Sequence, residues 1–340
     1  MKYAGIDSHR DHFSIGSMCR LLEVSRSGLH DWRHRPVSQR SQDDARLAQE
    51  LHARYLRHRG KYGRPRLTAD LREAGFRVNH KCVHRLMRRG GLHARQPRRF
   101  ERTTDSRHGF ALAPNVLDQR FETSAPDRVW LADITYVATD EGWLYVAIVM
   151  DLFSRKFVGW AMSAHVDGAL TLNALHLALG RRHPGQDLIH HSDRGSQYCT
   201  TDYRQRLAEA GITVSMSRRA NCYDNVPMES ANGTLKVERV YDEHYATRQQ
   251  AIDDLTAYFG YYNTERRHSA LGYLSPAEFE RRWYAQQNRA SPRDPSYPRR
   301  ALCVRRKRRT RPPGDNSTPS DHGVHQTGTG SEGAIWSAWL

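Results

Sequence analysis

The sequence predicts an α/β fold in which helical segments precede a mixed five-stranded sheet flanked by helices. Up to about residue 95, apolar residues recur at helical spacing, and from about residue 126 the chain becomes rich in β-branched and aromatic residues. After that change the expected elements follow in the order three strands, helix, strand, helix, strand, helix, which is typical of a mixed sheet covered by helices. The length of 340 residues allows about two domains.

The positive charge is concentrated toward the two ends of the chain. Of the net charge of +16, residues 1–125 contribute +13, residues 126–284 contribute −3 and residues 285–340 contribute +6. Such a surface attracts a polyanion, so nucleic acid is the expected partner, although a solvated surface that aids solubility gives the same pattern. Arginine accounts for 47 of the 53 basic residues, which fits either phosphate binding or the base composition of the gene.

Simple counts exclude several classes of protein. The longest apolar run, Trp143–Met150, has eight residues, whereas a membrane helix needs about 20, so we expect no membrane span. The N-terminus has no apolar signal core, and the five cysteines are scattered without a CxxC pair. These features argue against secretion, a disulfide framework and a structural zinc site, and they predict a cytoplasmic protein.

The first helical segment, residues 1–38, is predicted to resemble a short helix-turn-helix. Apolar side chains recur at helical spacing between Ser14 and Glu23, and Ser25 can cap a second helix that runs to about Trp32. In a helix-turn-helix the second helix enters the major groove of DNA. The pattern is weak by itself, because many helical hairpins share it and bind nothing.

A second helical segment, residues 40–95, is the better candidate for DNA binding. It begins with a helix over 40–58, and the stretch RGKYGRPR at 59–66 then predicts either a phosphate-contacting loop or a plain basic linker. Asn79 can cap a further helix, His80–Arg89, which two glycines terminate. The face of this helix away from its apolar residues carries the candidate DNA-binding side chains Lys81, His84, Arg85, Arg88 and Arg89.

The sheet and its covering helices are expected within residues 124–286. The predicted strands lie at 129–139, 143–151, 156–162, 188–191 and 212–216, and the predicted helices at 169–179, 202–210 and 224–240. Residues 96–123 lack periodicity and predict a basic linker. Residues 287–340, which contain RRKRR at 305–309, have little to bury and predict a disordered basic tail.

Three acidic residues stand where strands end or where a helix begins. Asp133 lies in the first strand, Asp193 follows the fourth strand, and Glu229 lies near the start of the long helix. Carboxylates brought together repel unless a divalent cation neutralises them, and two such cations can clamp an in-line phosphoryl transfer. Lys236 follows Glu229 by seven residues, two turns along the same helix face, where its charge can hold a phosphate.

Other polar residues compete for a place in this site. Asp151 ends the strand next to the first one and can approach the same carboxylates. Asp224 is expected to cap the long helix, and His190 and His191 are expected to pack at a strand end rather than to bind metal. Spacing alone therefore favours a metal-dependent nuclease only as one interpretation among several.

The order of the motifs resembles that of one family. In sequence, the chain contains WLADITYV, GWLYVAIVMDLFSRKFVGW, HSDRGSQY, SMSRRANCYDNVPMES and YYNTERRHSALGYLSPAEF. This series closely resembles the OrfB-type transposases of the IS-three group of bacterial insertion sequences, over residues 1 to about 284. The resemblance implies a ribonuclease H-like integrase catalytic core of the DDE type, with Asp133, Asp193 and Glu229 as the metal-binding catalytic residues and Lys236 as the basic residue that follows them.

The resemblance also implies an activity, a cofactor and partners. The implied activity is DNA strand cleavage at the ends of an insertion sequence followed by strand transfer. Mg²⁺ or Mn²⁺ is the implied cofactor, with two ions. The implied partners are DNA (element ends and target), an OrfA-type partner or fusion, and further copies of the chain in a homo-oligomer on DNA, at the bacterial nucleoid.

Two features depart from the family pattern. Ala231 and Asn232 stand where the family commonly has two phenylalanines, which predicts an underpacked helix face, and the tail beyond about residue 287 has no counterpart. A catalytically dead end-binding repressor of transposition is therefore the alternative function. A ribonuclease H-like hydrolase also fits the fold, but it does not account for the two N-terminal helical segments.

Overall fold

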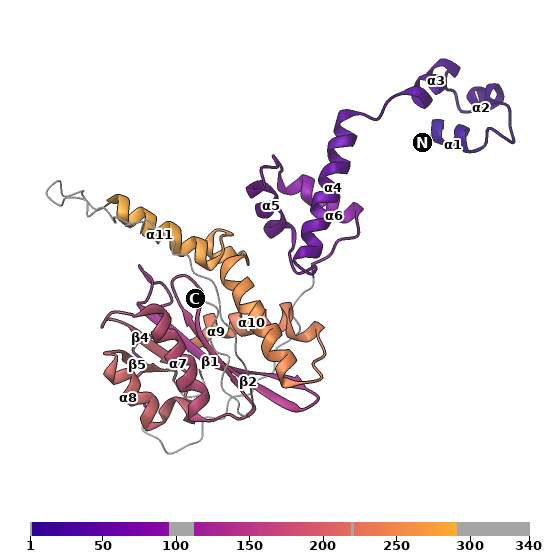
Figure 1. The fold of residues 1–340 in the computed structure, drawn as a ribbon. Helices are drawn as coiled ribbons and strands as arrows, with labels where there is room; N and C mark the ends of the chain where they lie inside the picture. Colours follow the sequence, from indigo (N-terminus) through magenta and orange to yellow (C-terminus); the bar gives the residue numbers. More distant parts are fainter. Residues whose placement is uncertain (1, 95–111, 219–220, 291–340) are drawn as a thin grey trace, which may run out of the picture. The chain divides into compact units, whose positions relative to one another are not determined.

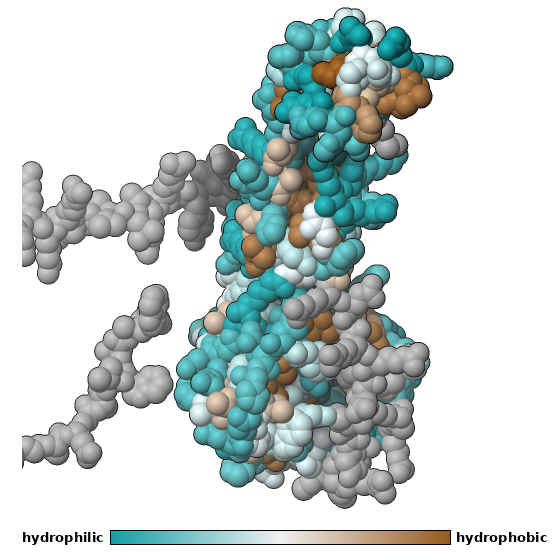
Figure 2. Space-filling view, turned by 90° about the vertical axis from the view of Figure 1, so that its right-hand side faces the viewer, coloured by the Kyte–Doolittle hydropathy of each residue, from teal (hydrophilic) through white to brown (hydrophobic). Residues whose placement is uncertain are grey.

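Three short helices at the N-terminus surround a small core of their own. The computed structural model describes residues 2–94, 112–218 and 221–290 of the chain. The first helices are α1 (Lys2–Ser8), α2 (Ile15–Leu21) and α3 (Arg26–His34). Ile6, Cys19 and Leu29 are buried between them, and Ser25 caps α3 as predicted. Apolar surface remains visible over these helices in Figure 2. Leu21 of α2 is 82% exposed.

A second group of three helices follows and has a separate core. Its members are α4 (Gln39–Arg57), α5 (Arg64–Glu73) and α6 (His80–Arg89). Leu51, Leu67 and Val83 are buried where these helices meet. The backbone amide of Cys82 donates to Oδ1 of Asn79 at 2.8 Å, so Asn79 caps α6 and fixes its first residue.

The basic stretch between α4 and α5 is engaged within the chain. Lys61 is 8% exposed, and its Nζ donates to the backbone oxygen of Val237 at 2.9 Å and pairs with Asp242. Tyr62 is fully buried, and the backbone amide of Arg267 donates to its hydroxyl at 2.8 Å. These two side chains are therefore neither part of a solvated linker nor placed to bind phosphate.

The sheet that follows has the strand order β3-β2-β1-β4-β5 (Figure 1). The strands are β1 (Val129–Thr139), β2 (Gly142–Asp151), β3 (Phe157–Ser163), β4 (Ile189–Ser192) and β5 (Thr213–Met216). Strands β1, β2 and β3 pair antiparallel, whereas β4 runs parallel to β1 and β5 parallel to β4. The sheet is therefore mixed and five-stranded, which confirms the predicted fold class.

Helices cover both faces of this sheet and create two cores. The helices are α7 (Gly168–Arg182), α8 (Thr201–Glu209), α9 (Val226–Glu238), α10 (Arg248–Thr264) and α11 (Pro276–Ala290). Short 3-10 helices lie at Ser196–Cys199, Cys222–Asn225, Val240–Asp242 and Ser269–Leu271. Trp130 of β1 packs with α7 and α8, and its neighbour Leu131 packs with α9 and α10. Successive side chains of a strand point to opposite faces, so β1 supplies both cores.

Parts of the chain predicted to lack structure lie largely outside the described residues. This holds for 96–111 of the predicted linker and for 291–340 of the predicted tail. The remaining stretch 112–123 has no helix or strand, yet Leu117 within it is 3% exposed and belongs to the core around α9. Within the described ranges, no helix is both long and apolar enough to cross a membrane.

Gly159 of β3 is required by the close approach of α7. A Cβ atom at this position would lie 2.2 Å from the backbone oxygen of Ala174 and 2.7 Å from Cβ of Ala178. We expect Gly159→Ala to lower the free energy of unfolding by about 3 kcal/mol, because a packed backbone must shift to admit the methyl group. Gly180→Ala is the matched control, since nothing lies within 4 Å there, and it should raise stability by up to about 1 kcal/mol. Urea unfolding measures both, and equal stabilities would contradict this account.

His268 is buried in its neutral form and makes stability depend on pH. Burial, with the charges of Arg266, Arg66 and Arg155 beside it, lowers the pKa of His268 to about 2. The unfolded chain takes up this proton below about pH 6.5, so the contribution of neutral His268 is complete above that pH and is lost as the pH falls. Between pH 7.5 and 5.5 we expect the wild type to lose about 1 kcal/mol more than His268→Gln. Urea unfolding at both pH values tests this; parallel losses would show that His268 does not titrate on unfolding.

Candidate active site

The site forms where two neighbouring parallel strands, β1 and β4, diverge. Their pairing aligns Val129 with Ile189 and Leu131 with His191, and β4 then ends at Ser192. Continued by two residues, this register sets Asp133 opposite Asp193. The parallel pairing thus brings together two carboxylates that are 60 residues apart in the sequence.

Asp133 is held in one orientation by two donors. Its Oδ1 accepts from the backbone amide of Ile134 at 2.9 Å, and its Oδ2 accepts from Nδ2 of Asn232 at 2.8 Å. Burial first, and then the negative charges of Asp193 and Glu229, raise the pKa of Asp133 well above its ordinary value. All three predicted carboxylates are therefore close enough to interact electrostatically.

Helix α9 contributes a polar stripe to this site. Glu229, Asn232 and Lys236 are spaced by three and four residues, which places them on one face of the helix. The adjacent stripe, Met228 and Leu235, is fully buried against the sheet and fixes how the helix is rotated. Consequently the polar stripe is directed at the diverging strands.

Lys236 reaches the same region and rests on an aromatic ring. Its Nζ lies 4.7 Å from the centre of the Tyr136 ring, a cation–π contact, and Tyr136 meets Trp143 edge-on at 4.9 Å. Burial lowers the pKa of Lys236, and the nearby carboxylate of Asp133 opposes that shift. The ammonium group is thus held beside the carboxylates, as the spacing of seven residues predicts.

The chemistry of this set of side chains fits a divalent cation. Three mutually repelling carboxylates, one of them with a raised pKa, form the kind of site in which a bound cation offsets the repulsion. In the part of the chain that the structure describes, no group of three or more His, Cys, Asp or Glu side chains is gathered closely enough to hold a metal ion.

Family comparisons agree with this arrangement of elements. Residues 123–222 match the family model of an integrase core domain, residues 210–276 match a second model of that description, and residues 41–100 match an HTH-like domain. An insertion element IS600 protein of 31 kDa from Shigella sonnei, itself uncharacterized, is 44% identical over 268 residues, covering 78% of this chain and 98% of that protein. The transposase InsF for insertion sequence IS3A of Escherichia coli K12 is 42% identical over 283 residues, covering 82% and 98%. The chain belongs to the IS3 transposase family.

Solved structures of integrases are also similar to this IS3 family member. A simian T-cell lymphotropic virus intasome bound to the PP2A subunit B56 gamma matches with a TM-score of 0.40 at 14% identity, covering 75% of this chain and 77% of the other. The catalytic core of HTLV-2 integrase in complex with magnesium matches with a TM-score of 0.37 at 13% identity, covering 46% and 97%.

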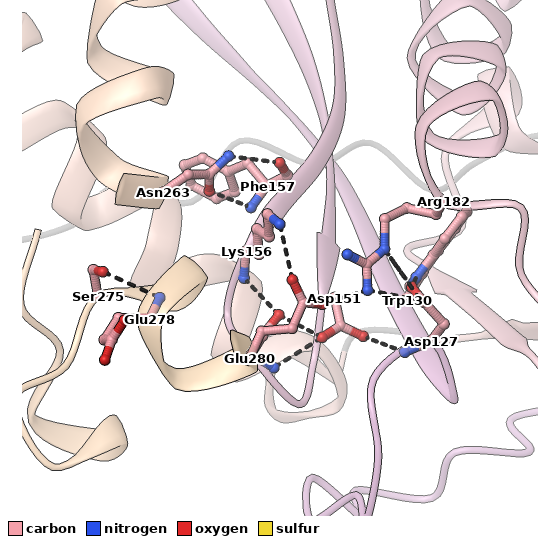
Figure 3. A network of polar contacts seen from close by, with 11 residues as sticks. Asp127, Trp130, Asp151, Lys156, Phe157, Arg182, Asn263, Ser275, Glu278 and Glu280 are labelled. Carbon is pink, nitrogen blue, oxygen red and sulfur yellow. Dashed lines mark hydrogen bonds and ion pairs between the residues drawn. The ribbon is translucent and has the colours of Figure 1, made fainter. Parts of the chain in front are cut away.

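Asp151 can approach the three carboxylates according to the sequence, but in the structure it stabilises the turn after β2. It is fully buried and accepts from the backbone amide of Asp127 at 2.9 Å and from the amide and hydroxyl of Ser154 at 2.8 and 2.6 Å. Figure 3 shows it within a polar network that also contains Arg182 and Glu280, which link α7 to α11. Asp151 therefore holds the turn after β2 and takes no part in the candidate site.

Two further sequence expectations are resolved by the hydrogen bonds. Asp224 was expected to cap α9, and this is wrong: its carboxylate accepts from the backbone amide of Arg218 at 2.7 Å, from the Arg218 guanidinium and from Gln119. His190 and His191 are buried, and they bond to Tyr203 and to Ser215 and Ser217 respectively. Burial lowers the pKa of both histidines, so they are neutral packing residues, as expected.

Sequence reasoning missed two residues whose side chains interact with the carboxylates. Asn232 was expected to leave the face of α9 underpacked, whereas both it and Ala231 are 5% exposed and Asn232 bonds to Asp133. Tyr198 is 2% exposed, and the charges of Asp193 and Asp133 add to the effect of burial in raising the pKa of its hydroxyl. Tyr198 lies in HSDRGSQY, a motif whose individual roles the sequence did not resolve.

The HTH-like domain presents a basic groove on α6. The five predicted residues Lys81, His84, Arg85, Arg88 and Arg89 are all exposed and line one groove of about 490 Å³. Arg64, the first residue of α5, lines it as well and was not predicted. Arg85 is partly neutralised, since its Nη2 donates to Asp44 at 2.7 Å. The groove is thus positive, and Asp44 offsets part of the charge of Arg85.

Proposed function

We propose that this chain is the catalytic subunit of a DNA transposase, which cuts DNA at insertion-sequence ends and joins the freed ends to target DNA. The observation that carries the proposal is the convergence of Asp133, Asp193 and Glu229, with Lys236 beside them, at the point where β1 and β4 diverge. The membership of the IS3 transposase family and the basic groove of the HTH-like domain support it.

The side chains of the site divide the chemistry among them. Asp133, Asp193 and Glu229 would hold Mg²⁺ or Mn²⁺, two ions in the proposed working site, which supply charge neutralisation for an in-line phosphoryl transfer when bound. Lys236 would attract the phosphodiester and set it against the carboxylates. Asn232 and the backbone amide of Ile134 would keep Asp133 oriented. Cleavage and joining then use the same site, and no covalent protein–DNA bond is required.

The lysine and the groove serve different parts of the substrate. Lys81, His84, Arg85, Arg88 and Arg89 would bind duplex DNA through its phosphates, whereas Lys236 acts at the reacting phosphodiester. A synaptic assembly needs two element ends, so we infer a homo-oligomer on DNA. An OrfA-type partner or fusion is inferred to add end recognition, and DNA as substrate places the activity in the bacterial cytoplasm, at the nucleoid.

The experiment that tests this function assays both chemical steps. Purified chain is mixed with an OrfA-type partner and a labelled duplex that carries the element's own end, with Mn²⁺ in one arm and EDTA in the other. Cleaved and joined products that need Mn²⁺ are the expected result. End binding without products under the same conditions would support the catalytically dead repressor instead. Hydrolysis of RNA–DNA hybrids without joining would support a ribonuclease H-like hydrolase.

A further inference from the structure

Asn232 occupies the middle of the polar stripe on α9, and the orientation of Asp133 accounts for only one of its two polar atoms. It lies between Glu229 and Lys236 on the same helix face, three residues after one and four before the other. Its side chain is 5% exposed, which is unusual for an amide with four hydrogen-bonding positions. A polar side chain so deeply buried needs partners, and the identity of those partners indicates its task.

One half of the Asn232 amide is committed to Asp133. Nδ2 donates to Oδ2 of Asp133 at 2.8 Å. The other oxygen of Asp133 accepts from the backbone amide of Ile134 at 2.9 Å. The carboxylate therefore has one fixed donor on each oxygen.

The other half of the amide lacks a protein partner. Oδ1 of Asn232 is buried and accepts no hydrogen bond from any residue that the structure describes. The two terminal atoms of an amide are only about 2.2 Å apart, as its bond lengths dictate, so this oxygen lies next to the Asp133 carboxylate. A buried acceptor without a donor lowers the stability of a protein by about 1–3 kcal/mol. Such a cost is expected to have a compensating function.

We propose that Asn232 is a positioning residue of the metal site, whose nitrogen fixes the Asp133 carboxylate and whose oxygen adds a neutral acceptor for the divalent cation and its waters. A carbonyl-type oxygen suits Mg²⁺ and Mn²⁺, and it brings no additional negative charge to three carboxylates that already repel. Asn225 offers a similar atom nearby: its Nδ2 donates to the backbone oxygen of Ala132 at 3.3 Å, and its buried Oδ1 likewise accepts from no described residue. The inference rests on the proposed function, because it assumes that the three carboxylates bind the cation.

The test compares variants by metal binding, stability and cleavage. Asn232→Leu keeps the number and branching of the side-chain heavy atoms and removes both polar atoms, while Asn232→Asp keeps an oxygen and removes the donor. Asn173→Leu, at an exposed position of α7, is the matched control. Mn²⁺ affinity is measured by electron paramagnetic resonance of the free ion. The melting temperature is measured with and without Mn²⁺, and cleavage is measured on the labelled end duplex.

Asn232→Leu is expected to weaken Mn²⁺ binding and cleavage by about 10- to 100-fold each, the range typical of residues that orient metal ligands. Its melting temperature without metal should change little, because the loss of the hydrogen bond to Asp133 is offset by the removal of the unsatisfied Oδ1 acceptor. Asn232→Asp should melt earlier without metal, bind Mn²⁺ more tightly than Asn232→Leu, and gain more stability from Mn²⁺ than the wild type does. A purely structural role would lower the melting temperature of Asn232→Leu and leave the Mn²⁺ affinity of the folded protein unchanged.

Two results would overturn the proposal. They also distinguish a failure of this proposal from a failure of the proposed transposase function. In the first result, Asn232→Leu binds Mn²⁺ as tightly as the wild type and Asn173→Leu do. Asn232 then has no role at the metal, while the proposed transposase function stands. A wild type that neither binds Mn²⁺ nor cleaves the end duplex overturns both the proposed function and this inference.

Discussion

Asp193→Asn is expected to abolish DNA cleavage and joining while leaving the binding of duplex ends intact. Asp193 stands opposite Asp133 where β1 and β4 diverge, far along the chain from the basic groove on α6. Losing its charge removes one of three carboxylates that would hold the cation. Several kcal/mol of transition-state stabilisation then disappear, which corresponds to at least about 1,000-fold in rate. Denaturing gels of labelled end duplexes measure both steps, and gel-shift titration measures binding.

The same substitution is expected to stabilise the protein in the absence of metal. The charge of Asp193 contributes to the raised pKa of Asp133, so its removal relieves a repulsion. A higher melting temperature than that of the wild type at pH 8 in EDTA is therefore expected. Asp253→Asn is the matched control: it lies on α10, is exposed, and accepts from Gln249 through an oxygen that asparagine retains. Cleavage by Asp193→Asn at the rate of this control would show that the residue is misassigned.

Local sequence signals were sufficient to predict the bounds of a helix or strand where neighbouring residues determine both of its ends. Helix α6 was predicted with its observed bounds, because Asn79 supplies the cap and two glycines follow the last turn. Strand β1 was also predicted with its observed bounds, since its run of β-branched and aromatic residues changes abruptly at both ends. In these elements the partners of the decisive residues lie only a few positions away in the sequence.

Sequence reasoning failed where a residue's partner is distant in the chain. Asp224 has the form of a helix cap, yet its carboxylate is bound by Gln119, 105 residues earlier, and by Arg218. Lys61 reads as a solvated cation, yet it bonds to Val237, 176 residues later. Asn232 reads as a packing defect, yet it bonds to Asp133, 99 residues earlier. No periodicity or spacing within a helix carries information on such contacts.

The candidate site stays a prediction, and its topology explains why the sequence could suggest it. Its carboxylates occur at a strand position, a strand end and a helix start, and parallel pairing of β1 with β4 brings strand positions of this kind together. The site's finer polar partners depend on the rotation of α9, which the burial of Met228 and Leu235 determines only once the sheet has formed. The acidic residues could therefore be predicted from the sequence, whereas the residue that orients Asp133 could not.

Lys81→Ala combined with Arg88→Ala is expected to weaken binding to duplex DNA and to flatten its salt dependence. Both side chains are exposed in the groove on α6, whereas Val83 on the opposite face is fully buried, so the fold of the domain should survive the change. Each lost phosphate contact reduces the slope of log K against log salt by about 0.9, so the double variant should lose about 1.8. Fluorescence anisotropy of a labelled duplex over a range of salt concentrations measures this slope.

A matched change of charge separates a binding groove from a general effect of positive charge. Arg46→Ala combined with Arg77→Ala removes the same charge from exposed positions of the same domain that do not line the groove. Long-range attraction depends on total charge and would weaken equally in both double variants, since it is insensitive to which residues carry the charge. Direct phosphate contacts depend on position, so only the groove variant should show a reduced slope of log K against log salt. Equal slopes for the two double variants would mean that α6 does not contact the DNA backbone, and that the groove is positive without being the binding surface.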